Sequence, residues 1–261
     1  MARLPRLYAP KIPQLVQAEF AYPLAAVQDP TPQDQLDQLQ QWLQRDVREC
    51  RIALHGWLLL NDRITLLATP GDAQGMARLI QSLGRRMATT MRHGRVFAGR
   101  YRSALVEPGQ WVLPAMIWLE SLPVRLHYVD QAERWPWSSA GAHTGLRAQH
   151  SLPSTASSTA PPHPGQTLLT DHHDYWQDGN TPFARQAHYR GRLSRGLSGS
   201  QIARIDQALF GQWVLGEADF LVRLASQTSR RMTPAPRGRP RKVQVPAQGQ
   251  EPTGGISATD G

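Results

Sequence analysis

The spacing of apolar residues predicts strands alternating with helices in the first half of the chain. The runs that favour strands are residues 11–20, 51–60, 64–69 and 96–106. Apolar residues recur at helical spacing over residues 32–50, 73–91 and 111–127, and Pro123 is expected to distort the last of these helices. The link Asn61-Asp62 is short enough only for a hairpin. This order predicts an α+β fold in which helices pack on one sheet.

The composition changes after residue 148, which predicts a division of the chain. Residues 1–148 form the expected α+β domain, and residues 149–168, rich in Ser, Thr, Ala and Pro, are expected to be a flexible linker. Residues 169–232 are expected to be a helical C-terminal region, with helices over 182–193, from Ser198 or Ser200 to 210, and over 216–227. Residues 233–261 are expected to be a basic, disordered tail.

The charge of the chain favours a nucleic-acid partner. The sequence has 29 Lys and Arg against 20 Asp and Glu, a formal net charge of +9, and only two lysines, Lys11 and Lys242. The planar guanidinium group of arginine suits phosphates and guanine edges. A GC-rich genome would also favour arginine codons, and composition alone does not separate the two explanations.

Cysteine content and hydropathy indicate an intracellular protein. The single cysteine, Cys50, excludes a disulfide framework and a Cys-based zinc site. The N-terminal residues lead into no long apolar run, so no signal peptide is expected. Apolar runs of the length of a membrane span, about 18 residues, are absent from the sequence.

Six sequence blocks carry a resemblance to a known family. They read HGWLLLNDRITLLATP from His55, GRRMATTMRHGRVFAGRYRSALVE from Gly84, WLESLPVRLHYV, RWPWSSAGAHTG, LGEADF and PRGRPRK. In this order they resemble the REP-associated tyrosine transposases, a branch of the HUH single-tyrosine transposases. The resemblance implies a ferredoxin-like antiparallel sheet that binds single-stranded hairpins of palindromic repeats. It also implies a His-hydrophobic-His strand that holds Mg²⁺ or Mn²⁺, and a helix tyrosine that attacks the DNA phosphodiester and forms a phosphotyrosine.

This chain departs from the family at both parts of that catalytic centre. The two histidine positions fall on Arg63 and Thr65, and a guanidinium group has no free lone pair for a metal. The tyrosine position falls on Met87, while Tyr101 belongs to a block that the family carries beside its nucleophile. We therefore expect no catalytic residue, no metal site and no cofactor. The alternative is an active, metal-dependent transposase that uses other residues.

The binding surface is expected to remain. The candidate DNA-binding residues are Arg85, Arg86, Arg92, Arg95, Arg100, Arg102, Arg237 and Arg239. The last two belong to an AT-hook-like Pro-Arg-Gly-Arg-Pro segment suited to a narrow minor groove. Trp135 and Trp137 would add base stacking, unless they are core residues, and the helix arginines are otherwise a solvated face.

His172-His173 is interpreted as a loop with a helix cap rather than a metal site, because adjacent histidines on regular structure point apart and no further ligands lie nearby in sequence. Single-stranded hairpin or palindromic repeat DNA is the expected partner, with nucleoid localisation and no membrane; monomer and homodimer both stay open. A decaying gene product with no function is the third hypothesis, against which the intact helical spacing argues.

Overall fold

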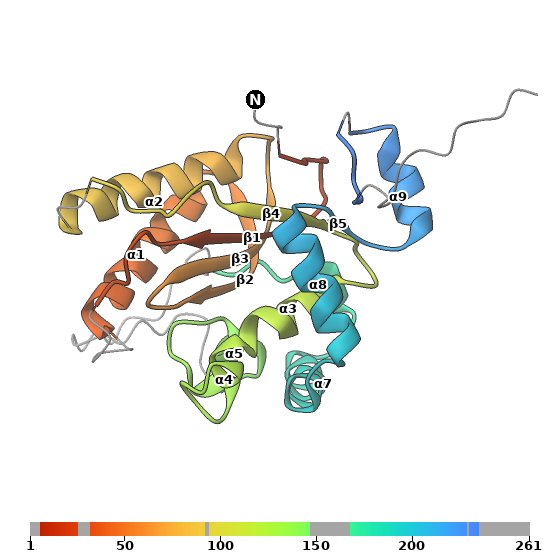
Figure 1. The fold of residues 1–261 in the computed structure, drawn as a ribbon. Helices are drawn as coiled ribbons and strands as arrows, with labels where there is room; N and C mark the ends of the chain where they lie inside the picture. Colours follow the sequence, from red (N-terminus) through yellow and green to blue (C-terminus); the bar gives the residue numbers. More distant parts are fainter. Residues whose placement is uncertain (1–5, 26–31, 92–93, 147–167, 229, 235–261) are drawn as a thin grey trace, which may run out of the picture.

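The computed structural model describes residues 6–25, 32–91, 94–146, 168–228 and 230–234. Its first elements are β1 (Gln14–Glu19), α1 (Gln33–Glu49), β2 (Ile52–Leu59), β3 (Arg63–Pro70), α2 (Gly75–Met91) and β4 (Arg102–Val106). The strands lie in the order β2-β3-β1-β4, and each pair in this series is antiparallel. A βαββαβ chain with this strand order is a ferredoxin-like sheet, so the predicted fold class is confirmed (Figure 1).

Helices α1 and α2 cover one face of the sheet (Figure 1). The buried stripe of α1 is formed by Leu36, Leu39, Leu43 and Val47, at the spacing that predicted this helix. The corresponding buried residues of α2 are Met76, Leu79, Ile80, Leu83 and Met87. Phe97, in the segment after α2, stacks on Phe20, directly after β1, with ring centroids 5.8 Å apart. The α1/α2 layer therefore closes one side of the core.

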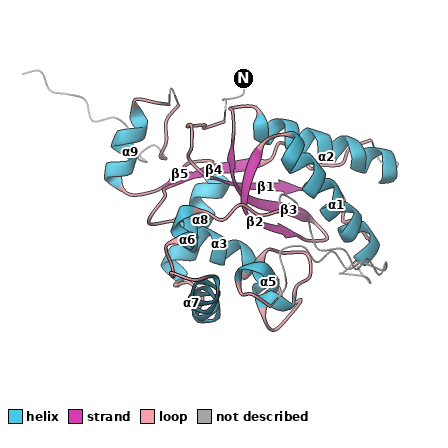
Figure 2. Cartoon of the chain, turned by 180° about the vertical axis from the view of Figure 1, so that it is seen from behind, coloured by secondary structure: helices cyan, strands magenta, loops and turns pink. Residues whose placement is uncertain are grey.

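The other face of the sheet is covered by α3 (Val112–Glu120) and α8 (Gly199–Gly211), with α5 (Ala140–His143) and α7 (Pro182–Arg195) on the same side, as both ribbon views show (Figures 1 and 2). A Cβ built on Gly56 of β2 would lie 3.9 Å from Met116 of α3 and 3.6 Å from Ser139. Glycine therefore lets β2 approach this layer closely. The helix predicted over 111–127 ends at Glu120 and restarts as α4 (Leu122–Arg125), which confirms the distortion expected at Pro123.

The C-terminal segment joins the same core. Its helices α7 and α8 match the predicted ones, and Tyr189, Leu193, Ile205 and Leu209 belong to the main hydrophobic cluster. A short strand that the sequence did not predict, β5 (Val214–Leu215), pairs in parallel with β4, and α9 (Ala218–Ala225) follows. Most of the predicted linker, and the tail beyond residue 234, lie outside the described residues. Residues 168–228 thus add a fifth strand and part of the second helical layer.

Two smaller elements and one boundary complete the fold. A 3-10 turn, η1 (Ala132–Arg134), and α6 (His173–Trp176) connect the helices of the second layer. The strand predicted over 96–106 is shorter, since residues 96–101 form only the isolated bridge between Phe20 and Phe97 before β4 begins. Among the described residues, none of the helices is both long and apolar enough to cross a membrane.

Candidate nucleic-acid interface

Arg63 and Thr65 point to the α3/α8 side of the sheet. Thr65 is paired across the sheet with Gln17 of β1, and Arg63 with Glu19. Cross-strand partners share a face, and so do residues two apart on one strand. Leu67, two residues after Thr65, is the partner of Gly56, whose Cβ direction leads to α3. The two positions where the family resemblance places metal ligands therefore share one face with Gln17 and Glu19.

The side chains at these positions do not fit a divalent metal ion. Arg63 donates to both carboxylate oxygens of Asp62, at 2.9 and 2.5 Å, and this hydrogen bonding raises the pKa of the guanidinium group. Thr65 is fully buried and its hydroxyl oxygen has no partner among the described residues. Glu19 already accepts hydrogen bonds from Arg102 at 2.6 Å and from Gln17 at 3.0 Å. The described residues contain no group of three His, Cys, Asp or Glu suited to a metal.

Met87 lies on the far side of the sheet from Thr65. It is 2% exposed and belongs to α2, which covers the opposite face (Figure 1). A tyrosine at position 87 would be separated from position 65 by the sheet itself. Position 87 therefore lies on the opposite side of the sheet from positions 63 and 65, although the sequence resemblance grouped the three in one expected catalytic centre.

The tyrosine of α7, on the same side of the sheet as Thr65, is unsuited to nucleophilic attack. Tyr189 is fully buried and donates a hydrogen bond from its hydroxyl group to Glu120 at 2.7 Å. Burial, followed by the charge of Glu120, raises the pKa of this tyrosine well above its usual value. Its hydroxyl group is thus neutral and enclosed, whereas an attacking tyrosine needs an accessible oxygen.

A cleft of about 250 Å³ opens at the edge of this face, beside the start of β4. It is lined by Gln17, Glu19, Ala98, Gly99, Arg100 and Arg102. The guanidinium group of Arg102 lies 4.9 Å from the ring centre of Phe210, at the end of α8. Arg100 is exposed and forms no ion pair with any described residue. The cleft therefore contains two cations. Arg100 has no ion pair with a described residue, whereas Arg102 lies between the carboxylate of Glu19 and the ring of Phe210.

The remaining predicted arginines divide into four groups. Arg85 is exposed and without an ion pair in the described part of the chain. Arg86 is bound to Asp46 of α1, a fully buried carboxylate, at 3.2 Å. Arg95 turns back on its own segment, with its guanidinium donating to the carbonyl oxygens of Phe97 and Ala98. The residues Arg92, Arg237 and Arg239 lie outside the described residues. The structure thus leaves Arg85 and Arg100 available without breaking an existing contact.

The tryptophans and the histidine pair have structural roles. Trp135 and Trp137 are buried, and their indole N–H groups donate to the carbonyl oxygen of Leu59 at 3.0 Å and to Asp37 at 2.7 Å. They are core residues. The ring of His172 caps α6 by accepting from the backbone N–H of Asp174 at 3.2 Å, which confirms the predicted helix cap.

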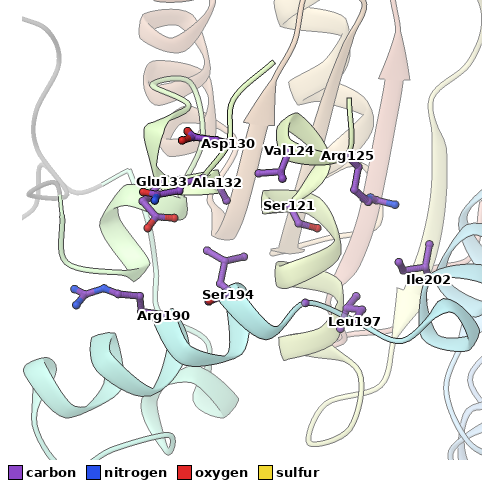
Figure 3. A pocket seen from close by; sticks show the side chains of 13 residues that line it. Ser121, Val124, Arg125, Asp130, Ala132, Glu133, Arg190, Ser194, Leu197 and Ile202 are labelled. Carbon is purple, nitrogen blue, oxygen red and sulfur yellow. The ribbon is translucent and has the colours of Figure 1, made fainter. Parts of the chain in front are cut away.

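A second cavity of about 500 Å³ lies between α4 and the end of α7 (Figure 3). Ser121 and Val124 face Ser194 and Leu197 across it, and Arg125 lies at one side. None of the arginines predicted to bind DNA lines this cavity. It is therefore separate from the cleft at β4.

Sequence reasoning missed Phe210, Glu19 and Gln17. Phe210 was predicted only as the end of a helix, although its 48% exposure sets it apart from the buried apolar residues of α8. The contact between Phe210 and Arg102 depends on how α8 packs on the sheet, and no pattern in the sequence predicts it.

Of the comparisons with known proteins, only the one with solved structures gives matches. No family model matches the chain, and no curated protein matches it. One similar solved structure is a REP-associated tyrosine transposase bound to a REP hairpin, with a TM-score of 0.48 and 14% identity, covering 56% of this chain and 86% of that chain. Another is a candidate transposase from Deinococcus radiodurans R1, with a TM-score of 0.32 and 18% identity, covering 41% of this chain and 88% of that one. The strand order described above, and not these likenesses, defines the fold class.

Proposed function

We propose that this chain is a DNA-binding protein on a transposase-like scaffold, that it binds single-stranded or hairpin repeat DNA, and that it has lost strand cleavage. The observation that carries the proposal is the hydrogen-bonded pair of Arg63 and Asp62. It places a fixed cation where the family resemblance requires a metal ligand. A guanidinium group there has no lone pair for a metal ion, so the pair argues against metal-dependent cleavage.

Charge and accessibility support DNA as the partner. The chain has a formal net charge of +9, and Arg85 and Arg100 are exposed without ion pairs in the described part of the chain. Lys and Arg contacts to phosphates release counterions, so we expect the affinity to fall steeply as salt rises. The exposed Phe210 beside Arg102 favours unpaired bases over a closed duplex, because a ring can stack only on a base face that is free.

The test is binding of the purified protein to fluorescent single-stranded hairpins, with EDTA or with Mn²⁺, followed by a denaturing gel of the same samples. We expect salt-sensitive binding that EDTA does not reduce, and no covalent band. A covalent band that depends on Mn²⁺ would overturn the loss of cleavage and support the alternative of an active transposase. Failure to bind any hairpin at low salt would overturn DNA binding itself.

A further inference from the structure

Phe210 is an exposed apolar residue beside the buried face of α8. Ile205, Ala208 and Leu209 of α8 are buried in the core, whereas Phe210 is 48% exposed. Its ring is covered in part by the guanidinium group of Arg102, which Glu19 holds at 2.6 Å. An aromatic ring fixed beside an arginine that lines the cleft has the features of a base-stacking platform.

The floor of the adjacent cleft contains an unsatisfied hydrogen-bond acceptor. Gln17 is 2% exposed, and its amide nitrogen donates to Glu19 at 3.0 Å. A carboxylate only accepts, so this contact fixes the amide with its nitrogen toward Glu19. The amide oxygen, Oε1, is buried and has no partner in the described structure. Buried polar atoms are nearly always hydrogen-bonded, so we expect a bound ligand to donate a hydrogen bond to this oxygen.

Two other residues that line the cleft supply a positive charge and close access. Arg100 is exposed and forms no ion pair with a described residue. Gly99 beside it has open space where a Cβ would lie, so a ligand can approach the backbone there. A phosphate group is the anion that a single exposed guanidinium next to a glycine suits best in a DNA-binding protein.

We propose that this cleft binds one unstacked nucleotide of single-stranded DNA. The base stacks on Phe210, its exocyclic amino group donates to Oε1 of Gln17, and the adjoining phosphate contacts Arg100. This site rests on the proposed DNA-binding function and gives the C-terminal helix α8 a direct part in it. Cytosine, which carries an amino group where thymine carries a carbonyl oxygen, is preferred over thymine.

The first experiment separates stacking from charge. Phe210→Leu removes the ring, and Phe183→Leu is the matched control, because Phe183 of α7 is 82% exposed and, unlike Phe210, makes no cation–π contact with an arginine that lines the cleft in the described structure. Each protein is titrated by fluorescence polarisation with a short single strand, with an abasic strand that keeps every phosphate, and with the matching duplex. We expect Phe210→Leu to weaken only the base-containing single strand, by roughly tenfold, the loss typical of one stacked base. Arg100→Ala is expected to weaken the normal and the abasic strand alike.

The outcomes distinguish this site from the proposed function. Binding by the wild-type protein that is unchanged in Phe210→Leu would overturn the site and leave DNA binding standing. Absence of binding by the wild-type protein to all three ligands would overturn DNA binding first. An equal loss in Phe183→Leu would also overturn the site.

The second experiment tests the base edge without relying on a variant. We expect the wild-type protein to bind oligo(dC) several-fold more tightly than oligo(dT), two pyrimidine strands that differ at the group facing Gln17. Gln17→Met, which keeps the side-chain length but removes the acceptor, is expected to abolish this preference. Equal affinity of the wild-type protein for the two strands, or a preference that persists in Gln17→Met, would overturn the role of Gln17.

Discussion

Arg86 of α2 donates two hydrogen bonds to Asp46 of α1, at 3.2 and 3.4 Å, and the Asp46 side chain is completely buried. A buried carboxylate without a partner is strongly destabilising, so this arginine holds the two helices together. The neighbouring Arg85 is exposed and forms no ion pair with a described residue. Two adjacent arginines of one sequence block therefore have different roles.

This difference gives a matched pair of substitutions. Arg86→Ala is expected to lower the free energy of unfolding by about 2–3 kcal/mol, because Asp46 loses its cation. Arg85→Ala is expected to change stability by less than about 0.5 kcal/mol but to weaken DNA binding. Urea denaturation of both variants, with hairpin titrations at low salt, checks these effects. If the Arg86→Ala protein were as stable as the wild-type protein but bound DNA more weakly, Arg86 would be assigned to DNA binding instead.

Local patterns predicted the elements of this fold better than its site. Apolar spacing located α1, α2 and the β2–β3 hairpin, because each is set by residues close in sequence. The strand β5 has only two residues, too few to show an alternation of apolar and polar positions. Its pairing with β4 also joins segments that are far apart in the sequence. Met87 was grouped with Thr65 on motif order alone, whereas the faces of the sheet decide which residues can meet. Contacts such as Phe210 with Arg102 arise only from packing between layers.

A buried polar network attaches α7 to the rest of the protein. Glu120 accepts hydrogen bonds from Ser139 at 2.5 Å, from His143 at 2.6 Å and from Tyr189 at 2.7 Å. Tyr189→Phe removes one donor and leaves a carboxylate oxygen buried without it. We expect a loss of about 2 kcal/mol in the free energy of unfolding, measured by urea denaturation. Tyr175→Phe, which removes a hydrogen bond to the backbone oxygen of His143 instead, is expected to cost less.

The basic tail is expected to strengthen binding without changing the fold. Its Pro236-Arg237-Gly238-Arg239-Pro240 segment offers two arginines for the minor groove. The double substitution Arg237→Ala and Arg239→Ala should weaken binding to AT-rich duplex DNA. It should also make the plot of log affinity against log salt concentration less steep, by the amount that corresponds to about two phosphate contacts. Its thermal unfolding should match that of the wild-type protein. An unchanged salt slope would show that the tail makes no such contact.

His55 should make stability depend on pH. Its ring nitrogens pair with the carbonyl oxygen of Thr170 and the hydroxyl of Thr69, both at 2.8 Å, and burial lowers the pKa of His55 from 6.5 to about 4. Between these two values the unfolded chain binds the proton and the folded chain does not. The contribution of the neutral ring is therefore complete above pH 6.5 and is lost as the pH falls toward 4, by roughly 3 kcal/mol. Denaturant titrations across this pH range should show that the free energy of unfolding depends less steeply on pH in His55→Gln than in the wild-type protein. The same pH dependence in both proteins would assign the effect to another group.

Introducing the two histidines of the family that the sequence resembles is expected not to produce cleavage. Arg63→His and Thr65→His together would place two rings on one face of β3, since residues two apart on a strand point the same way. Position 65 is fully buried, so the larger ring should lower the free energy of unfolding by about 1–3 kcal/mol. The α7 tyrosine on that side is enclosed with a raised pKa, so it is not available as a nucleophile beside the histidines. The double variant should therefore gain Mn²⁺ affinity by calorimetry but give no covalent DNA band on a denaturing gel. A covalent band from the double variant, absent from the wild-type protein, would show that a nucleophile still reaches this face.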